Sequence, residues 1–337
     1  MSPTNPILKQ WLQENCALPI DALQEIAGDA SFRRYFRLKS GTQSYMVMDA
    51  SQQRDSFEPY AAIARALLSL GVTVPEIMAQ DLAQGFMLIS DFGDQQYLNA
   101  LSNSNADSLY KTALDSLARL QTCREVRDWT LPTFDQRFMQ RELSEFKHWF
   151  LERYLKLSFS APENTLLQTT FNQLCVAAEK QTQVFIHRDY HSANLMVLPQ
   201  QAVGILDFQD ACIGPVTYDP VSLLRDCYID WPDEKVQSWA ASYYERLRAD
   251  QQLSEVSLEQ FMIEFDWMGL QRHMKALFIF ARKYLRDHTP RYLKFLPRTL
   301  NYVVRISARY PELQAFHAFV SDLSLPVHEE EVAQCGG

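Results

Sequence analysis

Three side chains near the middle of the sequence have the types and spacing that phosphoryl transfer requires. Asp189 lies in the run His-Arg-Asp-Tyr-His-Ser-Ala-Asn, which ends at Asn194, and Asp207 follows the apolar run Val-Gly-Ile-Leu. In the kinase template a loop aspartate takes the acceptor proton, an asparagine five residues later binds Mg²⁺, and a later aspartate holds Mg²⁺ against the phosphates. The pattern predicts Asp189 as the base and Asn194 and Asp207 as metal ligands.

The residues between Asn194 and Asp207 are expected to form a β-hairpin. Two apolar runs, Leu-Met-Val-Leu and Val-Gly-Ile-Leu, are separated by Pro-Gln-Gln-Ala, which is typical of two strands and a short turn. In this pairing Leu195 faces Leu206, and Asn194 and Asp207 are neighbours about 5 Å apart at the open end. Two such oxygen ligands suit Mg²⁺, which takes its other ligands from water and phosphate.

The alternative is that the motif arose by chance and that Asp207 merely caps a strand, because a motif match is a hypothesis until its context agrees. The hairpin supplies that context, so we favour phosphoryl transfer. His187 is expected to brace the loop backbone. His191 is expected to shape the loop by hydrogen bonding rather than to carry protons.

Composition and charge restrict the class of protein. A chain of 337 residues can bury about three quarters of its unfolded surface, and 47% hydrophobic residues are ordinary for a globular protein. The net charge of -9 argues against nucleic-acid binding through a basic face. The six cysteines lack metal-ligand spacing, and from the N-terminal composition and the lack of a long apolar run we expect neither a signal peptide nor a membrane span. We expect a cytoplasmic monomer that binds a small molecule, with no nucleic acid and no membrane.

The order of predicted elements indicates an α+β protein with two lobes. Strand patterns at 32–39, 44–48, 75–78 and 86–90 surround a helix at about 55–70, and helical patterns dominate from residue 106 onward. This order predicts a small N-terminal mixed-sheet lobe that binds the nucleotide and a larger, mainly helical C-terminal lobe. The expected bounds are 1–90 for the first lobe, 91–325 for the second and 326–337 for a tail.

Asp91-Phe92-Gly93 spells the metal motif of protein kinases but stands about a hundred residues before the catalytic loop. It also follows an apolar strand that leaves the small lobe. We therefore interpret this segment as the hinge between the lobes. Backbone groups at Ser90 and Asp91 are expected to meet the adenine of ATP, and no metal is assigned here.

Several segments resemble a known family. Residues 184–196, 204–211 and 214–226 are similar to the aminoglycoside phosphotransferase-like superfamily, which has a bilobal protein-kinase-like fold. More narrowly, residues 28–37, 228–231 and 268–275 resemble the bacterial anomeric kinases of N-acetylmuramate and N-acetylglucosamine. The resemblance runs from about residue 20 to residue 320 of the sequence.

The resemblance implies that ATP and Mg²⁺ are the cofactors and that residues 28–34 cover the ATP phosphates through Ser31, Phe32, Arg33 and Arg34. One departure matters. The third strand of the family usually carries a basic residue that grips the phosphates, but here it reads Tyr-Met-Val-Met-Asp. Arg33 or Arg34 is the candidate substitute, because a guanidinium can bridge phosphate oxygens. The alternative is that both are exposed, solubilising charges.

The resemblance also implies an acceptor, the C1 hydroxyl of an amino sugar, and a role in reuse of cell-wall peptidoglycan. Arg225 and Arg272 could pair with a substrate carboxylate, Asp226 could bind the sugar, and Tyr228 could stack on its ring. The alternative for the arginines is an internal salt bridge to Asp226 or Asp219. For Asp219 we favour a role in bracing the catalytic loop.

Two other functions stay open at this point. One keeps the chemistry and changes the acceptor to an aminoglycoside, choline or homoserine, although the arginines near the expected pocket disfavour a polycationic antibiotic. The other is a pseudokinase that binds nucleotide and serves as a scaffold, which the missing third-strand cation motivates. The presence of Asp189, Asn194 and Asp207 makes the scaffold the weaker hypothesis.

Overall fold

The computed structural model describes residues 6–15, 22–26, 33–52, 57–253 and 255–326. The chain divides into two compact units. The first comprises residues 1–131 together with 193–211, and the second comprises 132–192 together with 212–337. The first unit thus extends beyond the 1–90 lobe expected from the sequence, because it continues through two more helices and then takes in the hairpin that carries Asn194 and Asp207.

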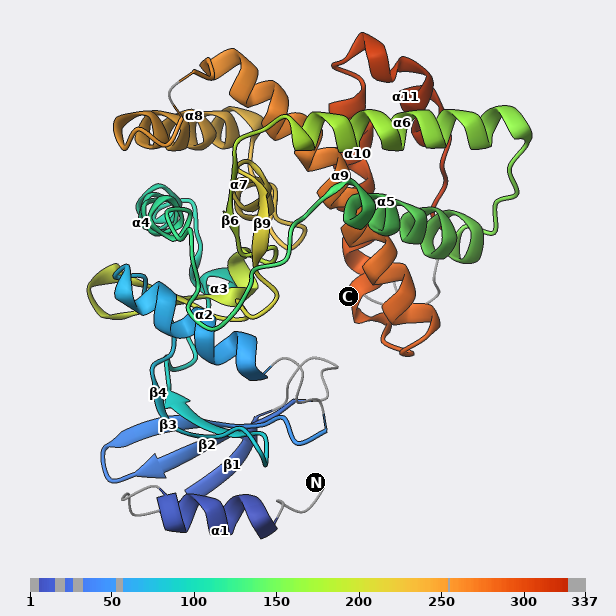
Figure 1. The fold of residues 1–337 in the computed structure, drawn as a ribbon. Coiled ribbons are helices and arrows are strands. Elements are labelled where there is room, and N and C mark those ends of the chain that lie inside the picture. Colours follow the sequence, from blue (N-terminus) through green and yellow to red (C-terminus); the bar gives the residue numbers. More distant parts are fainter. Residues whose placement is uncertain (1–5, 16–21, 27–32, 53–56, 254, 327–337) are drawn as a thin grey trace. The chain divides into compact units, whose positions relative to one another are not determined.

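An antiparallel sheet of five strands, ordered β1-β2-β3-β5-β4, is the centre of the first unit (Figure 1). Gly41, with φ of +58°, makes the tight turn between β2 and β3. The expected strands are present, but the sequence patterns missed β1 and placed β4 two residues too early. The bounds are β1 Ala22–Ile26, β2 Arg34–Ser40, β3 Gln43–Asp49, β4 Ile77–Asp81 and β5 Phe86–Ser90.

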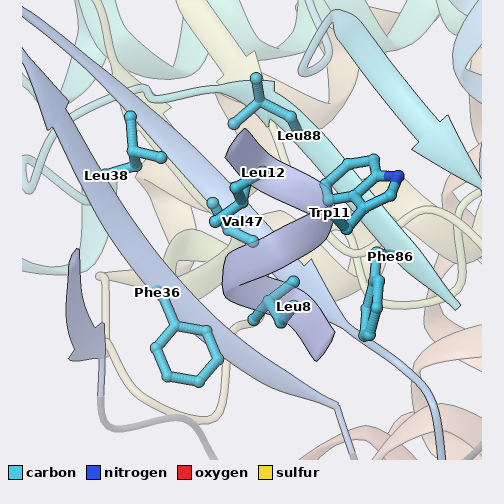
Figure 2. Close-up of a cluster of buried hydrophobic side chains, with 8 residues drawn as sticks. All are labelled: Leu8, Trp11, Leu12, Phe36, Leu38, Val47, Phe86 and Leu88. Atoms are coloured by element: carbon cyan, nitrogen blue, oxygen red, sulfur yellow. The ribbon is translucent and has the colours of Figure 1, made fainter. Parts of the chain in front are cut away.

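Helix α1 (Pro6–Asn15) closes one face of this sheet. Its three buried side chains recur at helical spacing and pack on apolar side chains that alternate along β2, β3 and β5 (Figure 2). This packing is the hydrophobic core of the sheet. Its members are Leu8, Trp11, Leu12, Phe36, Leu38, Val47, Phe86 and Leu88.

Further helices and one hairpin complete the first unit. Helix α2 (Phe57–Ser69) is followed two residues after its end by Gly71, whose φ of +71° takes the chain out of the helix. Helices α3 (Tyr97–Ala100) and α4 (Ala106–Leu120) follow β5. The hairpin consists of β7 (Leu195–Val197) and β8 (Val203–Ile205).

The second unit is mainly helical, as expected. The 28-residue helix α9 (Leu258–Leu285) is buried along most of its length, and it contacts α5, α6, α7, α8 and α10. A two-stranded pair, β6 (Gln183–Ile186) with β9 (Cys212–Pro215), brackets the catalytic loop in sequence. The other helices are α5 Gln136–Glu145, a π-helical segment Phe146–Tyr154, α6 Ala161–Glu179, α7 Tyr218–Leu224, α8 Asp233–Ala249, a 3₁₀ segment Pro290–Phe295, α10 Leu296–Ser307 and α11 Gln314–Ser321.

None of the helices in the described ranges combines the length and the apolar character that crossing a membrane would need. The expected tail falls almost entirely outside the described residues, which end at residue 326.

Candidate active site

The catalytic loop, residues 187–192, follows β6 and is held by a buried carboxylate. Asp219, at the start of α7, accepts hydrogen bonds from the backbone N–H groups of His187 at 2.6 Å and Arg188 at 3.0 Å. Burial raises the pKa of Asp219 to about 7, although the two N–H donors favour its ionised form. The prediction that Asp219 braces the loop is confirmed.

The two histidines of the loop also have the structural roles expected for them. His187 is fully buried, and its Nδ1 accepts a hydrogen bond from the Asp189 N–H at 3.3 Å. The backbone N–H of His191 donates to the Asp189 carbonyl at 3.1 Å, and the His191 ring meets the Tyr228 ring edge-on at 5.4 Å. These contacts fix the backbone on both sides of Asp189.

Asp226 fixes the other end of the loop. Its Oδ2 accepts from the Ser192 N–H at 2.9 Å and from Ser192 Oγ at 2.5 Å, while Oδ1 accepts from the Tyr228 N–H at 2.9 Å. The carboxylate is almost completely buried. Its oxygens therefore serve the protein backbone, so we replace the predicted sugar-binding role of Asp226 with one in positioning the loop.

Lys275 is the functional residue that sequence reasoning missed. It lies on α9, and its Nζ donates to Asp189 Oδ1 at 3.2 Å and to Tyr218 Oη at 3.2 Å. The side chain of Asp189 is 36% exposed, whereas that of Lys275 is 9% exposed. A ligand could therefore reach the carboxylate, and the lysine is enclosed behind it.

The charges around Asp189 determine its protonation. Burial favours the neutral acid, but Lys275, His191 and Arg188 outweigh that effect and lower the pKa of Asp189 below its ordinary value. Burial disfavours a charged Lys275, yet Asp189 and Tyr218 raise its pKa overall. Asp189 is thus an ionised acceptor at neutral pH, which a base for a hydroxyl proton must be.

One feature of the sequence could have revealed Lys275. It is the one charged residue in the otherwise apolar stretch from Met274 to Phe280 on a long buried helix. A lysine in such a place is rarely buried without a partner. The sequence could not say which acid, because Asp189 stands 86 residues earlier.

Arg188 adopts an unusual backbone conformation, with φ of +75°. Its guanidinium pairs with Glu142 on α5 at 3.2 Å and lies over the Phe138 ring at 4.7 Å. Glu142 also accepts from Gln271 on α9 at 2.8 Å. A left-handed residue other than glycine costs free energy, and such residues persist where surrounding contacts hold them. The contacts that hold Arg188 in this conformation therefore also position the next residue, the expected base Asp189.

The hairpin that carries the expected metal ligands is present in the first unit, but its register differs from the prediction by one residue. Leu195 pairs with Ile205 rather than with Leu206, and Leu206 N–H donates to the Asn194 carbonyl at 2.9 Å. The connection is longer than expected, because a 3₁₀ turn at 199–201 with two residues of positive φ separates the strands. Asn194 is therefore opposite Leu206, and Asp207 follows just beyond the paired strands.

Asp207 leaves the extended conformation altogether, with φ of +63°. Strand alternation therefore does not set the direction of its side chain, and its Oδ1 accepts from Gln209 Nε2 at 2.9 Å. One amide and one carboxylate provide hard oxygen donors of the kind that Mg²⁺ prefers. No cluster of three His, Cys, Asp or Glu side chains suited to a metal occurs in the described part of the chain. Mg²⁺ bound here would take its remaining ligands from phosphate and water.

The segment that follows β5 holds this hairpin in place. The Val197 N–H donates to the Gln95 carbonyl at 2.7 Å, and Gln96 Nε2 donates to the Ala193 carbonyl at 2.9 Å. A Cβ built on Gly204 would lie 2.6 Å from the Phe92 ring, so any other residue here would require the ring or the strand to move. The Asp-Phe-Gly segment thus contributes Phe92 to the packing of the β7–β8 hairpin.

Ser90 and Asp91 have protein partners on their side chains. Ser90 Oγ accepts from the Glu76 N–H at 2.9 Å. Asp91 pairs with Arg37 of β2 at 2.6 Å, and Arg37 also pairs with Asp94 at 2.8 Å. Burial opposes ionisation of Asp91, but the Gly93 N–H and Arg37 lower its pKa overall. Any contact with adenine would fall to backbone groups, as the hinge interpretation assumes.

The expected phosphate loop is only partly described. Ser31 and Phe32 lie outside the described residues. Arg34 pairs with Glu25 across β1 and β2 at 2.8 Å. Arg33 lies close to Tyr35. The pKa of Tyr35 is raised overall, because burial and the negative charge of Asp207 outweigh the opposite effect of Arg33. Of the two candidate cations, Arg33 is therefore the one near a proposed metal ligand.

The remaining predicted substrate residues separate into buried and accessible ones. Arg225 is 2% exposed, pairs with Asp266 at 2.5 Å and lies over the Phe265 ring. Its predicted role in binding a substrate carboxylate is therefore replaced by an internal salt bridge, formed with Asp266 and not with the acids considered above. Tyr228 is half-buried and packs edge-on against Phe295 at 4.8 Å.

Arg272, the last of these residues, is 6% exposed and donates from Nη1 to Cys227 Sγ at 3.2 Å. Among the predicted substrate residues, Tyr228 and Arg272 thus stay candidates for binding the acceptor. The Tyr228 ring contacts His191 of the catalytic loop, and Arg272 contacts the adjoining Cys227.

Comparison with known proteins agrees with this chemistry. A protein of Pseudomonas aeruginosa named N-acetylmuramate/N-acetylglucosamine kinase is 39% identical over 306 residues, which cover 91% of this chain and 90% of the relative. Proteins with the same name from Pseudomonas putida and Neisseria meningitidis are 38% and 37% identical, over 91% and 96% of this chain and 89% and 96% of theirs.

The fold has solved counterparts at low sequence identity. The ADP-bound aminoglycoside phosphotransferase APH(2'')-Ib has a TM-score of 0.62 at 14% identity, with 90% of this chain and 99% of that chain covered. The choline kinase LicA from Streptococcus pneumoniae has a TM-score of 0.60 at 13% identity, with 90% and 98% covered. These likenesses confirm the expected kinase-like α+β fold.

The profile of the family described as "Phosphotransferase enzyme family" matches residues 22–255, a span that includes the sheet, the catalytic loop and the hairpin. With the family and its relatives in agreement, the expectation of an ATP-dependent small-molecule kinase is confirmed. The chain belongs to the phosphotransferase enzyme family.

Proposed function

We propose that this kinase transfers the γ-phosphoryl group of ATP to the anomeric C1 hydroxyl of N-acetylmuramate, N-acetylglucosamine or both. The product is a sugar 1-phosphate, and the role is the reuse of cell-wall peptidoglycan fragments by a cytoplasmic, monomeric enzyme. The observation that carries the proposal is the near full-length similarity, at 37–39% identity, to relatives that bear the names of these two acceptors. The ionised Asp189, backed by Lys275, supplies the chemistry.

In the proposed reaction Asp189 orients the C1 hydroxyl and receives its proton as the oxygen bonds to the γ-phosphorus. An anomeric hydroxyl is more acidic than an ordinary alcohol, so a carboxylate of low pKa suffices as the acceptor. Lys275 holds one carboxylate oxygen, and the backbone contacts of Asp219 and Asp226 fix the loop. Most of the acceleration would come from positioning and electrostatics.

The proposed nucleotide-binding residues rest on the sequence motif and on the β7–β8 hairpin of the first unit, which carries Asn194 and Asp207. Asn194 and Asp207 would hold Mg²⁺, which when bound neutralises charge on the transferring phosphoryl group. Ser31, Phe32 and Arg33 would cover the phosphates, and the backbone at Ser90 and Asp91 would meet adenine.

The proposed lobes remain residues 1–90 for nucleotide binding and 91–325 for catalysis and acceptor binding. The helical part of this proposal is supported by the location of the catalytic loop and its braces within the second unit.

A panel of acceptors tests the proposal. The purified enzyme is incubated with ATP, Mg²⁺ and each of N-acetylmuramate, N-acetylglucosamine, an aminoglycoside, choline and homoserine. Mass spectrometry and phosphorus NMR should show a sugar 1-phosphate with an anomeric phosphorus–proton coupling. Phosphorylation of another acceptor, or nucleotide binding without any turnover, would replace the proposal by one of the alternative functions.

A further inference from the structure

Cations are concentrated where α9 ends and α10 begins, in a chain whose net charge is -9. Between residues 282 and 298 the sequence contains one acid, Asp287. The basic residues of the same stretch are Arg282, Lys283, Arg286, Arg291, Lys294 and Arg298. A local excess of positive charge in an acidic protein points to an anionic partner.

Two arginines from different helices converge on Cys227. Arg272 of α9 donates from Nη1 to Cys227 Sγ at 3.2 Å, and Arg298 of α10 donates from Nη1 to the Cys227 carbonyl at 3.3 Å. Cys227 stands between Asp226, which holds Ser192, and Tyr228, whose ring meets His191. The two guanidinium groups therefore contact the residue whose two neighbours in sequence contact the catalytic loop.

Neither Arg272 nor Arg298 has an ion pair with an acidic side chain, as far as the described residues extend. Other arginines in this unit do have one. Arg225 pairs with Asp266, and Arg309 pairs with both Asp233 and Asp266. Asp226 lies near Arg272, but its oxygens accept from Ser192 and Tyr228. Two like charges held close together favour an anion beside them.

Lys294 adds a third cation on an aromatic surface next to the loop. Its Nζ lies 5.1 Å from the centre of the Phe295 ring, and that ring packs edge-on against Tyr228 at 4.8 Å. Lys294 is exposed and Arg298 is half-buried, so both can meet a ligand. Arg298 is also held in one orientation by its bond to Cys227, which reduces the entropy lost on binding.

The two acceptors named for the relatives differ in one chemical group. N-acetylmuramate carries a lactyl ether with a carboxylate, and N-acetylglucosamine has a neutral hydroxyl in its place. We propose that Arg298 and Lys294, with Arg272 beside them, bind this carboxylate and so determine the preference between the two sugars. The inference rests on the proposed function and names the specificity site within it. A guanidinium binds a carboxylate through two parallel hydrogen bonds.

Steady-state kinetics on three acceptors test the inference. The acceptors are N-acetylmuramate, its neutral carboxamide and N-acetylglucosamine, and the variants are Arg298→Gln, Lys294→Gln and the double substitution. The double variant should raise the KM for N-acetylmuramate at least tenfold. The kcat/KM for the two neutral acceptors should stay within about twofold of the wild-type value, and Arg298→Lys should restore part of the loss. Lys180→Gln, at the exposed end of α6, is the charge-matched control.

Three results would overturn the inference. Equal losses on charged and neutral acceptors would mean that the cations only support the fold. A raised KM for ATP alone would assign them to the nucleotide, and unchanged kinetics would make them solvated charges. If the wild-type enzyme phosphorylates neither sugar, the proposed function fails separately. Calorimetry of N-acetylmuramate binding then decides, because equal binding by wild type and Arg298→Gln refutes the carboxylate site.

Discussion

The catalytic loop and the β7–β8 hairpin contain the three residues of one sequence motif, but different forces hold them. Side-chain charges fix the loop: Asp219 and Asp226 accept backbone N–H groups, and Lys275 holds Asp189. Uncharged hydrogen bonds with the Gln95 carbonyl and the Gln96 side-chain amide, together with packing of the Phe92 ring, fix the hairpin. The charge network sets the ionisation of the proposed base, whereas the hairpin carries the two oxygen groups proposed as metal ligands. Substitutions in the loop should therefore change kcat and its pH dependence, whereas substitutions in the hairpin should change the affinity for Mg²⁺.

The most severe effect is expected at the base. Asp189→Asn keeps the size of the side chain but removes the proton acceptor, so kcat should fall by about 10³-fold or more. The affinity for nucleotide should be nearly unchanged, since the proposed partner of Asp189 is the acceptor hydroxyl and not the nucleotide. Initial-rate kinetics and fluorescence titration with an ATP analogue measure the two quantities. Asp322→Asn on the exposed surface is the control, and a modest drop in kcat would remove Asp189 from the role of base.

Lys275 tests whether charge, and not only geometry, distinguishes the loop. Lys275→Met removes one charged hydrogen bond to Asp189, so kcat should fall roughly 10- to 100-fold. Lys275 lowers the pKa of Asp189, and its removal should raise that pKa. The acidic limb of the pH–rate profile should therefore move to higher pH, and activity should be lost earlier as the pH falls.

The Lys275→Arg variant separates this role from a structural one. It keeps the charge, so its acidic limb should stay close to that of the wild type even if kcat is reduced by the larger group. Thermal unfolding of both variants is measured in parallel. A pH–rate profile that does not move in Lys275→Met would show that Lys275 contributes packing and leaves the ionisation of Asp189 untouched.

The two regions also differ in how far the sequence predicted them. The hairpin follows from neighbouring residues, because strand patterns and a polar turn lie within fifteen positions of each other. Its register was wrong by one residue, since the pattern could not show that Gln200 and Gln201 take positive φ and lengthen the turn. The spacing of Asp189 and Asn194 predicted the motif, but the partners of Asp189 come from α9, where only tertiary packing could reveal Lys275.

The same limit explains Arg225 and Asp226. Both stand close to the loop in sequence and carry charges that could bind a sugar, which made them reasonable candidates. The structure gives Arg225 a partner 41 residues away and uses Asp226 to hold Ser192. Whether a charged side chain forms an ion pair inside the fold or binds a ligand depends on tertiary contacts that a single sequence does not show.

Overpacking tests the hairpin side of the comparison. Gly204→Ala places a methyl group 2.6 Å from the Phe92 ring, so the strand or the ring must move. Such overpacking costs about 1–3 kcal/mol, and it should lower the melting temperature and raise the apparent Kd for Mg²⁺ in the presence of ATP. The pH–rate profile should keep its shape, because the charges around Asp189 are unaffected.

The double variant Gly204→Ala with Phe92→Ala makes this test specific. Removing the ring provides space for the new methyl group, so the metal affinity should recover relative to Gly204→Ala alone. A Mg²⁺ affinity that is the same in wild type and in Gly204→Ala would show that the packing of Phe92 does not position Asn194 and Asp207.

The smallest effect, and the one that bears on the missing third-strand cation, is expected from the two neighbouring arginines. Arg33→Ala should raise the KM for ATP several-fold. Tyr35 interacts electrostatically with both Arg33 and Asp207, which places Arg33 near the proposed metal ligand and so near the expected phosphates. Arg34→Ala removes a solvent-screened surface ion pair with Glu25, which contributes little to stability, and should leave that KM unchanged. Each variant is the matched control for the other in initial-rate measurements at varied ATP. If neither substitution, nor the two together, changes the KM for ATP, the guanidinium groups do not replace the absent lysine, and the phosphates are held by backbone groups and metal alone.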